Sequence, residues 1–256
     1  MGNDRSLIKP SMWAALVMTC TLALPAAEEP WFAAMKAVHA KGLAQPGSVA
    51  QIGDSITYSK AFLAGLAWGE VKGPEWEVLK RLTVKDFNER KGAEHANYSG
   101  WTAADGLAKV PAVLAAEKPA IAVIMYGTND VRKQITPADY EKNLTAIIDL
   151  CLKAGCIPII STIPPQVGQD APVQAFNALI RKLATEAKIP LIDFHAEILS
   201  RQPGMAWNGT LLGKDDVHPS GGANFDFSEG NLKACGYALR NYLTCRALKQ
   251  VMERCF

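Results

Sequence analysis

The chain has 256 residues, of which 49% are hydrophobic and 20% charged, and its formal net charge is +2. This is an ordinary globular composition, long enough for one α/β domain with a sizeable core. The near-neutral charge, without a long run of Lys and Arg, argues against a nucleic-acid partner.

The first residues have the pattern of a secretory signal. Arg5 and Lys9 precede an apolar stretch at 12–24, and small residues follow it. Because this stretch of about 13 residues is short for a bilayer, it indicates a cleaved signal and no stable membrane insertion afterwards. We therefore expect a signal peptide at 1–27, one mature domain at 28–256 and a secreted or periplasmic protein. A buried N-terminal helix is the alternative.

The cysteines form neither a disulfide framework nor a metal motif. No C-x-x-C occurs, and the expected mature domain holds an odd number of cysteines, so buried free thiols with at most one disulfide are expected. Cys20 follows a poor match to a lipoprotein box, and we expect no lipid anchor there. His39, His95 and His195 have no neighbours that suggest a metal site. The sequence thus predicts neither a metal nor a cofactor.

In chain order, the hydrophobic pattern alternates between strands and helices. Short apolar runs that end at turn residues predict five strands, at 48–53, 95–99, 120–126, 156–162 and 190–193. Helical spacing predicts helices at 31–41, 58–68, 75–90, 103–117, 137–154, 171–187 and 196–200, and a last helix that Ser228 caps. Such alternation implies a parallel sheet covered by helices on both faces.

The first buried strand ends in a Gly-Asp-Ser turn. Gly53 has no Cβ, so the backbone can bend there, and helical spacing resumes after Ser55. A hydroxyl at this bend lies over the carboxyl end of the strand, where open α/β sheets bind ligands. The N–H groups of a helix start also favour developing negative charge. Ser55 is therefore a candidate nucleophile, although the tripeptide alone is also a common turn.

Other polar features follow later strand ends or lie in the last loop. Gly100 could present a backbone N–H with no side chain in the way, or simply make a turn. The amide of Asn129 could point at an oxyanion, or cap the next helix. The carboxylate of Asp215 could hold one ring nitrogen of His218 so that the other accepts the serine proton. Asp216 is the alternative partner, but an i to i+3 turn folds back more naturally than an i to i+2 turn.

Taken together, these residues resemble the four blocks of the SGNH hydrolase superfamily, also called GDSL esterases and lipases. The blocks are matched by 53–57 (Gly-Asp-Ser-Ile-Thr), by Gly100 within 97–102, by 127–130 (Gly-Thr-Asn-Asp) and by 215–220 (Asp-Asp-Val-His-Pro-Ser). The resemblance implies a flavodoxin-like fold, a three-layer αβα sandwich with a five-stranded parallel sheet.

The resemblance also implies a role for each matched residue. Ser55 would be the nucleophile, His218 the base, and Asp215 the residue that orients His218. The oxyanion hole would consist of the N–H groups of Ser55 and Gly100 and the side chain of Asn129. One departure is Trp101, which stands where an acidic or polar residue often follows the glycine.

These residues predict a secreted serine ester hydrolase that forms an acyl-enzyme. The loops at the catalytic edge are polar or mixed, and no apolar insertion could form a lid or a long trench. Short acyl (acetyl) esters are therefore expected, as small-molecule or polysaccharide substrates and above all on carbohydrate. Trp101 and Trp207 suit the apolar face of a sugar, or only pack the loops.

Other functions are compatible with the same residues. A lipase or lysophospholipase, and a sugar O-acyltransferase, would use the same nucleophile and base. A non-catalytic binding module is not expected, because Ser55 and His218 are both present.

Overall fold

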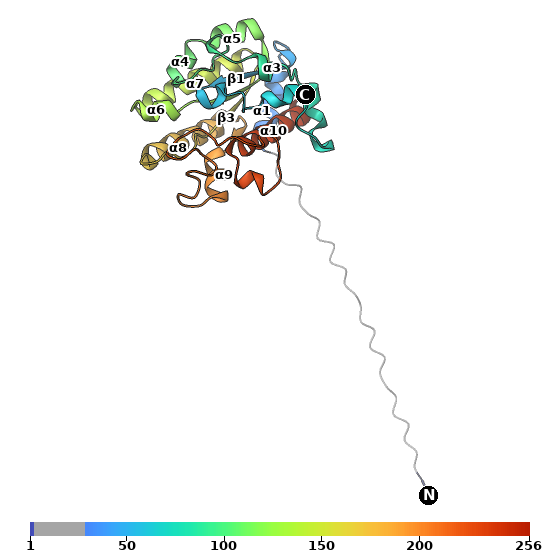
Figure 1. Ribbon diagram of the computed structural model, residues 1–256. Helices are drawn as coiled ribbons and strands as arrows, with labels where there is room; N and C mark the ends of the chain where they lie inside the picture. Colours follow the sequence, from blue (N-terminus) through green and yellow to red (C-terminus); the bar gives the residue numbers. More distant parts are fainter. Residues whose placement is uncertain (3–28) are drawn as a thin grey trace.

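The computed structural model describes residues 1–2 and 29–256 of the chain (Figure 1). Apart from its first two residues, the expected signal peptide at 1–27 lies outside the described residues. Four strands form one parallel sheet in the order β1-β2-β3-β4. They are β1 Gln45–Gly53, β2 Pro119–Met125, β3 Ile157–Ser161 and β4 Leu191–Ile192.

The strands have continuous apolar sequences because both faces of the sheet are covered. Every residue of β2 and β3 is buried, and so are the last seven residues of β1. Gly53 pairs with Met125, so β1 and β2 end at the same level. The turns that follow these two strands therefore lie side by side at the carboxyl edge of the sheet.

The prediction of a fifth strand at 95–99 is wrong. That segment makes two isolated bridges at Asn97, a parallel bridge to Gly53 and an antiparallel bridge to Gly92. Residues Ala93–His95 form a 3₁₀ helix, η3, and Ala96 has a φ of 57°, so the chain is extended for too short a stretch to make a strand. The bridge to Gly53 nevertheless places this segment beside β1 and brings residues 97–102 to the same edge.

The helices and 3₁₀ helices (η) precede, connect and follow the strands. They are α1 Trp31–His39, α2 Ser55–Tyr58, η1 Ala64–Trp68, η2 Pro74–Arg81, α3 Asp86–Glu89, η3 Ala93–His95, α4 Ala103–Leu107, α5 Val110–Glu117, α6 Thr128–Arg132, α7 Pro137–Lys153, α8 Asp170–Glu186, α9 Phe194–Arg201, η4 Asn231–Lys233 and α10 Gly236–Cys255.

Three helices expected as single elements are each divided in two. The break between η2 and α3 occurs where the N–H of Thr83 donates to Gly47 O over 2.8 Å, which takes the chain out of a helical path. The break between α4 and α5 precedes Pro111, which has no N–H to continue the helix. The break between α2 and η1 contains Leu63 in a left-handed conformation. The last helix begins at Gly236, later than a cap at Ser228 would give.

Two groups of helices pack against the sheet. In one group α5 contacts β1, α7 and α8 contact β3, and α4 packs on α7. In the other, α1 and α10 pack on each other and contact β3 and β4. Figure 1 shows α4 and α5 above the strands and α10 below them. Among the described residues, no helix combines the length and hydrophobicity needed to cross a bilayer. The five described cysteines are buried and free, as expected.

Candidate active site

The candidate nucleophile lies on a tight turn between β1 and α2. The side chain of Asp54 caps α2 by accepting a hydrogen bond from the N–H of Ile56 at 3.0 Å, which leaves Ser55 as the first helical residue. A Cβ on Gly53 would collide with the side chain of Thr57 and with the carbonyl oxygen of Met125. Glycine is therefore needed at this position because of close approach, and the turn presents the Ser55 hydroxyl at the sheet edge.

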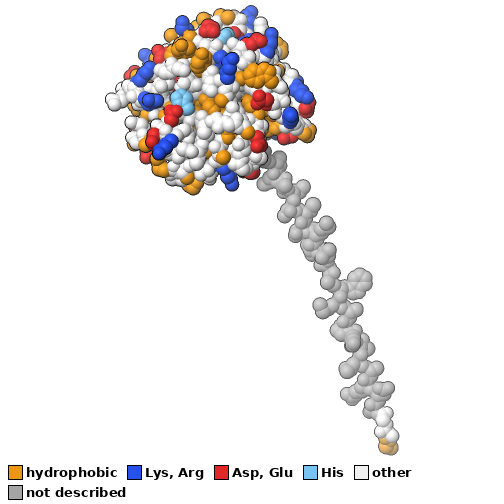
Figure 2. Space-filling view, viewed as in Figure 1, with side chains coloured by type: hydrophobic (Ala, Val, Ile, Leu, Met, Phe, Trp, Pro, Cys, Tyr) orange, Lys and Arg blue, Asp and Glu red, His pale blue; other side chains and the backbone are white. Residues whose placement is uncertain are grey.

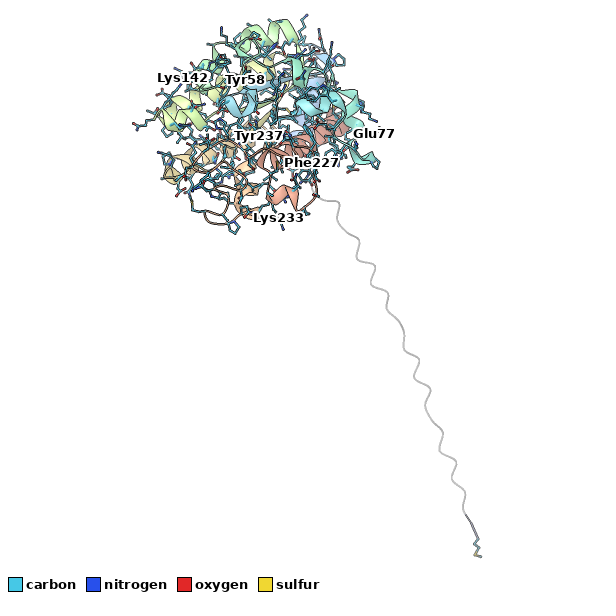
Figure 3. All side chains as sticks on the ribbon, viewed as in Figure 1. Tyr58, Glu77, Lys142, Phe227, Lys233 and Tyr237 are labelled. Atoms are coloured by element: carbon cyan, nitrogen blue, oxygen red, sulfur yellow. The ribbon has the colours of Figure 1, made fainter. Side chains whose placement is uncertain are left out.

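This turn is held from behind by the start of α10. Arg240 is buried, and its guanidinium donates to Ile56 O at 2.6 Å and to Thr57 Oγ1 at 2.8 Å. The hydroxyl of Tyr237 also donates to Ile56 O, at 3.3 Å. Figure 3 labels Tyr58 and Tyr237, which belong to the two elements that these bonds join. Burial lowers the pKa of Arg240 to about 10, so the group stays cationic at neutral pH.

A second cation binds the same turn. Lys91 is partly exposed, but its ammonium points inward and donates to Gln51 Oε1 and Thr57 O, both at 2.7 Å, and to Phe62 O at 3.2 Å. Burial of the ammonium, and then the charge of Arg240, lower its pKa well below the usual value. The sequence analysis assigned no role to Lys91 or Arg240. The signal in the sequence was the position of Arg240, which lies at helical spacing from Tyr237, Thr244 and Leu248 and so belongs to the same stripe of the last helix.

The structure brings the predicted base to the predicted nucleophile. His218 Nε2 lies 2.8 Å from Ser55 Oγ, although 163 positions separate the two residues. The other ring nitrogen, Nδ1, lies 2.9 and 3.0 Å from the two carboxylate oxygens of Asp216. Partial burial alone would raise the pKa of Asp216, but the hydrogen bonds from His218 and from the N–H of Val217 hold it below the usual value. Asp216 therefore stays ionised and fixes the ring of His218.

The assignment of Asp215 as the partner of His218 is wrong. Asp215 has a φ of 55°, and this left-handed conformation turns its side chain toward Asn208. Its carboxylate accepts from Asn208 Nδ2 at 2.9 Å, and its N–H donates to Asn208 Oδ1 at 2.7 Å. The expected i to i+3 turn would bring Asp215 back to His218, but Asp215 instead forms this reciprocal pair of hydrogen bonds with Asn208. The carboxylate that reaches His218 is the one two residues before it.

The predicted oxyanion residues line the same cleft as Ser55 and His218. The cleft has a volume of about 540 Å³ and is lined by Ser55, Ser99, Gly100, Asn129, Arg132, Lys133 and His218. Gly100 has a φ of 78°, which favours glycine, and its N–H donates to no acceptor among the described residues. The same is true of the N–H of Ser55. Two backbone donors are thus free to bind an oxyanion.

Unlike the two backbone donors, the side chain of Asn129 already donates hydrogen bonds within the protein. Its Nδ2 donates to Trp101 O at 3.0 Å and, weakly, to Asp54 Oδ2 at 3.4 Å. The first bond orients the amide, and the long second bond leaves one hydrogen that could turn toward an oxyanion. Lys133 Nζ donates to Gly100 O at 2.8 Å, which also fixes the peptide next to the predicted hole.

Two buried carboxyl groups support these turns. Burial raises the pKa of Asp54 to about 6, and burial also raises the pKa of Asp130 to about 6. The carboxylate of Asp130 accepts the N–H of Ala103 at 3.1 and 3.2 Å, which joins the segment after Gly100 to α6. The sequence analysis gave neither carboxyl group a role.

The two predicted substrate-binding tryptophans have different environments. Trp207 is only 1% exposed, so the expectation that it contacts substrate is wrong, and its alternative role in packing holds. Trp101 is partly exposed and begins an aromatic row with Tyr98 and Tyr58. The ring centroids are 5.9 Å apart for Trp101 and Tyr98, and 5.3 Å apart for Tyr98 and Tyr58. Both tyrosines were missed, although one follows Ser55 by three positions and the other precedes Gly100 by two.

A serine hydroxyl, an imidazole and a carboxylate in this order define the class of serine hydrolases. The family model of the GDSL-like lipase/acylhydrolase family matches residues 52–222, which is most of the chain. The protein therefore belongs to this family and is a serine ester hydrolase, which confirms the resemblance to the SGNH hydrolases.

The chain is similar to characterised relatives over the matched region. It is 30% identical to Esterase TesA of Pseudomonas aeruginosa over 171 residues, which are 66% of this chain and 78% of that protein. It is 27% identical to thioesterase 1/protease 1/lysophospholipase L1 of Escherichia coli over 171 residues, 66% of this chain and 74% of that protein. A solved G-D-S-L lipolytic protein from Desulfitobacterium hafniense superposes with a TM-score of 0.58 at 20% identity, covering 78% of this chain and 99% of that one. This last likeness shows the fold alone.

Proposed function

We propose that the protein hydrolyses short acyl esters, acetyl esters above all, on a carbohydrate alcohol. Ser55 Oγ attacks the acyl carbonyl while His218 Nε2 takes its proton, and Asp216 holds the other ring nitrogen. The N–H groups of Ser55 and Gly100, with the amide of Asn129, stabilise the oxyanion. His218 then protonates the leaving alcohol. Water activated by the same imidazole attacks the acyl-enzyme and releases the acid.

The observation that carries this substrate class is that, among the described residues, no apolar side chain, aliphatic or aromatic, belongs to the lining of the cleft. Apart from Gly100, every lining residue has a polar side chain. A long acyl chain gains about 0.8 kcal/mol for each CH₂ that it buries, which requires an apolar wall. The row of Tyr58, Tyr98 and Trp101 forms an exposed apolar surface beside this cleft. Aromatic faces of this kind suit the apolar face of a sugar ring, whose edge carries hydroxyl groups.

We also infer that the sheet is flavodoxin-like, with helices in layers on both of its faces. The segment at 97 bridges Gly53 on β1, while β2 pairs with the other side of β1. The chain thus moves first to one side of β1 and then to the other, and ligands of open α/β sheets bind at such a reversal. Ser55 and Asn129 follow the two strands that flank it.

The proposed substrate class is tested by a series of p-nitrophenyl esters from acetate to palmitate, together with acetate release from acetylated xylan. We expect kcat/KM to be highest for acyl chains of two to four carbons, with acetate released from the polysaccharide. A maximum at ten carbons or more would favour a lipase or lysophospholipase, the second candidate. The similarity to lysophospholipase L1 of Escherichia coli supports that second candidate. Product analysis with a sugar acceptor distinguishes hydrolysis from acyl transfer.

We propose in addition that the protein is exported. The support is the charged, apolar and small-residue pattern of residues 1–27. N-terminal sequencing of the protein made by its own host should give a mature chain that begins near Ala27 or Glu28. Recovery of an intact Met1 or Gly2 from the cytoplasmic fraction would remove the basis for an extracellular substrate.

A further inference from the structure

We propose that the alcohol portion of the substrate carries an anionic group, a carboxylate, phosphate or sulfate, which binds at Arg132 beside the catalytic serine. This inference rests on the proposed function. Because an acetyl group carries no charged substituent, the anion belongs to the alcohol that leaves.

The first support is the charge of the cleft. Arg132 and Lys133 are both exposed and both line the cleft that contains Ser55 and His218. No carboxylate belongs to that lining. Figure 2 shows basic and acidic side chains interspersed over one face of the molecule, so a cleft whose described lining holds Arg132 and Lys133 but no carboxylate differs from that surface. A concave site with charge of one sign attracts ligands of the opposite sign.

The second support is the pairing of these cations. Within the described part of the chain, neither Arg132 nor Lys133 forms an ion pair with a carboxylate. Lys133 is nevertheless occupied, because its ammonium donates to Gly100 O. Asp216, the carboxylate of the catalytic group, is bonded to His218. The guanidinium of Arg132 is therefore the cation in the cleft that remains available to a ligand.

The chemistry of Arg132 selects the kind of ligand. A guanidinium presents parallel N–H groups that match the two oxygens of a carboxylate, or the oxygens of a phosphate or sulfate. An acidic sugar combines such a group with an apolar ring face. The cleft offers the guanidinium of Arg132 on α6 for the anionic group, and the aromatic row formed by Tyr58, Tyr98 and Trp101 beside the cleft offers a surface for the ring face.

The test uses matched substrates that differ only in charge. Methyl glucoside and methyl glucuronide, each with one acetyl group at the same hydroxyl, differ at C6 alone, and the 6-phosphate and 6-sulfate of the glucoside extend the set. A second pair, 4-acetoxybenzoate and 4-acetoxybenzamide, varies the charge on an aryl acetate. The measured quantity is the ratio of kcat/KM for the charged substrate to kcat/KM for its neutral partner. The members of the anionic set distinguish carboxylate from phosphate and sulfate.

We expect the ratio to favour the anionic substrate by about tenfold, as for one charge-assisted hydrogen-bonded contact at an exposed position. Arg132→Gln should bring the ratio close to one by raising KM for the anionic substrate, because a contact remote from the reacting bond acts equally on substrate and transition state. Added salt should reduce the ratio of the wild-type protein. Lys153→Gln is the control, since Lys153 is an exposed cation at the end of α7, next to the opposite edge of the sheet, and it should change neither ratio nor activity.

The possible outcomes separate this inference from the proposed function. Hydrolysis of neutral and anionic acetates with a ratio near one would overturn the anion site and leave the esterase proposal intact. A ratio above one that persists in Arg132→Gln would also overturn the assignment of Arg132. Failure to hydrolyse any sugar acetate would overturn the carbohydrate proposal, and the aryl pair would still report whether Arg132 binds an anion.

Discussion

The proposed nucleophile, Ser55, and the proposed base, His218, are held by two very different regions. The turn that carries Ser55 is bound from behind by buried groups, the guanidinium of Arg240 and the ammonium of Lys91. The loop that carries His218 is more open, and the side chains of Asp216 and His218 are 47% and 40% exposed. One half of the site is thus built into the core, while the other half is a polar turn at the surface.

Both regions are nevertheless attached to the same element. The start of α10 binds the nucleophile turn through Arg240 and binds the histidine loop through its backbone, because the N–H of Tyr237 donates to Ser220 O at 3.0 Å. The N–H of Gly236 also donates to Ser220 Oγ at 3.0 Å. Helix α10 therefore sets the relative position of Ser55 and His218. Changes in the buried groups that bind the turn should affect both stability and catalysis, whereas changes in the exposed loop should affect catalysis alone.

The largest expected effect is the loss of the reacting groups. Ser55→Ala, and separately His218→Ala, should lower kcat by about 10⁴-fold or more, because the members of such a group act as a unit. Both substitutions remove exposed or half-exposed atoms, so the melting temperature should change little. Steady-state kinetics and thermal unfolding measure the two effects. A Ser55→Ala protein with a tenth of the wild-type kcat would contradict the mechanism.

The next largest effect tests the partly engaged oxyanion donor. Asn129→Ala should lower kcat by about 10²–10³-fold with little change in KM, as expected for a donor that acts on the transition state. The separate kcat and KM values are the measurement. A rise in KM at constant kcat would instead assign Asn129 to ground-state binding of the substrate.

The third prediction compares two neighbouring carboxylates of the exposed loop. Asp216→Asn should lower kcat by about 10²-fold or more, because His218 loses the group that fixes its ring and stabilises its charged form. Asp215→Asn is the matched control and should cost about threefold or less, since Asp215 bonds to Asn208 and not to the imidazole. The kcat values of the two variants, measured at one pH, show which carboxylate orients His218. The opposite order would restore Asp215 as the orienting residue.

These regions also show what the sequence could predict. Long periodic segments carry their own signal, and the helices expected at 137–154 and 171–187 agree with α7 and α8 to within a residue at each end. The blocks around Ser55, Gly100, Asn129 and His218 were found because strand ends and turn residues are local features.

The errors arose where distant contacts decide the structure. The helix expected at 75–90 is interrupted by a bond from Thr83 to Gly47, 36 positions away, and no local pattern shows such a bond. Arg240 reaches Ile56 across 184 positions. Asp215 and Asp216 have the same chemistry, so only the backbone conformation of the turn, and the presence of Asn208, decides which of them meets His218.

The fourth prediction concerns the buried side of the comparison. Arg240→Met should lower the free energy of unfolding by about 2–5 kcal/mol, because the buried Thr57 Oγ1 loses this donor and Ile56 O keeps only the longer bond from Tyr237. It should also lower kcat by about tenfold while KM changes little, since the Ser55 hydroxyl loses its fixed position. Arg246→Met on the same helix is the control, because Arg246 is exposed and should cost less than about 0.5 kcal/mol. Urea unfolding and kinetics of both variants are the measurements. Equal losses in the two variants would show that α10 does not fix the turn through Arg240.

The smallest expected effect is the pH dependence of the buried turn. Burial raises the pKa of Asp54 to about 6 from a value of 3.8, so the folded state binds a proton that the unfolded state has already lost between these two pH values. Ionisation of Asp54 therefore costs stability progressively as the pH rises from about 4 to 6, up to about 3 kcal/mol. Asp54→Asn carries no charge at any pH and avoids this cost.

The stability of the Asp54→Asn protein relative to wild type should therefore increase between pH 4 and pH 7. Burial also raises the pKa of Asp130, and the pKa values of Asp193 and Asp216 are lowered, but these groups are present in both proteins and nearly cancel in the difference. Urea unfolding of both proteins at the two pH values gives the result directly. A difference that stays constant with pH would show that Asp54 is not protonated preferentially in the fold. In that case the Asp54 carboxylate in the turn is stabilised as an anion by Arg240. Both regions of the site would then hold an ionised carboxylate, Asp54 in the turn and Asp216 in the loop.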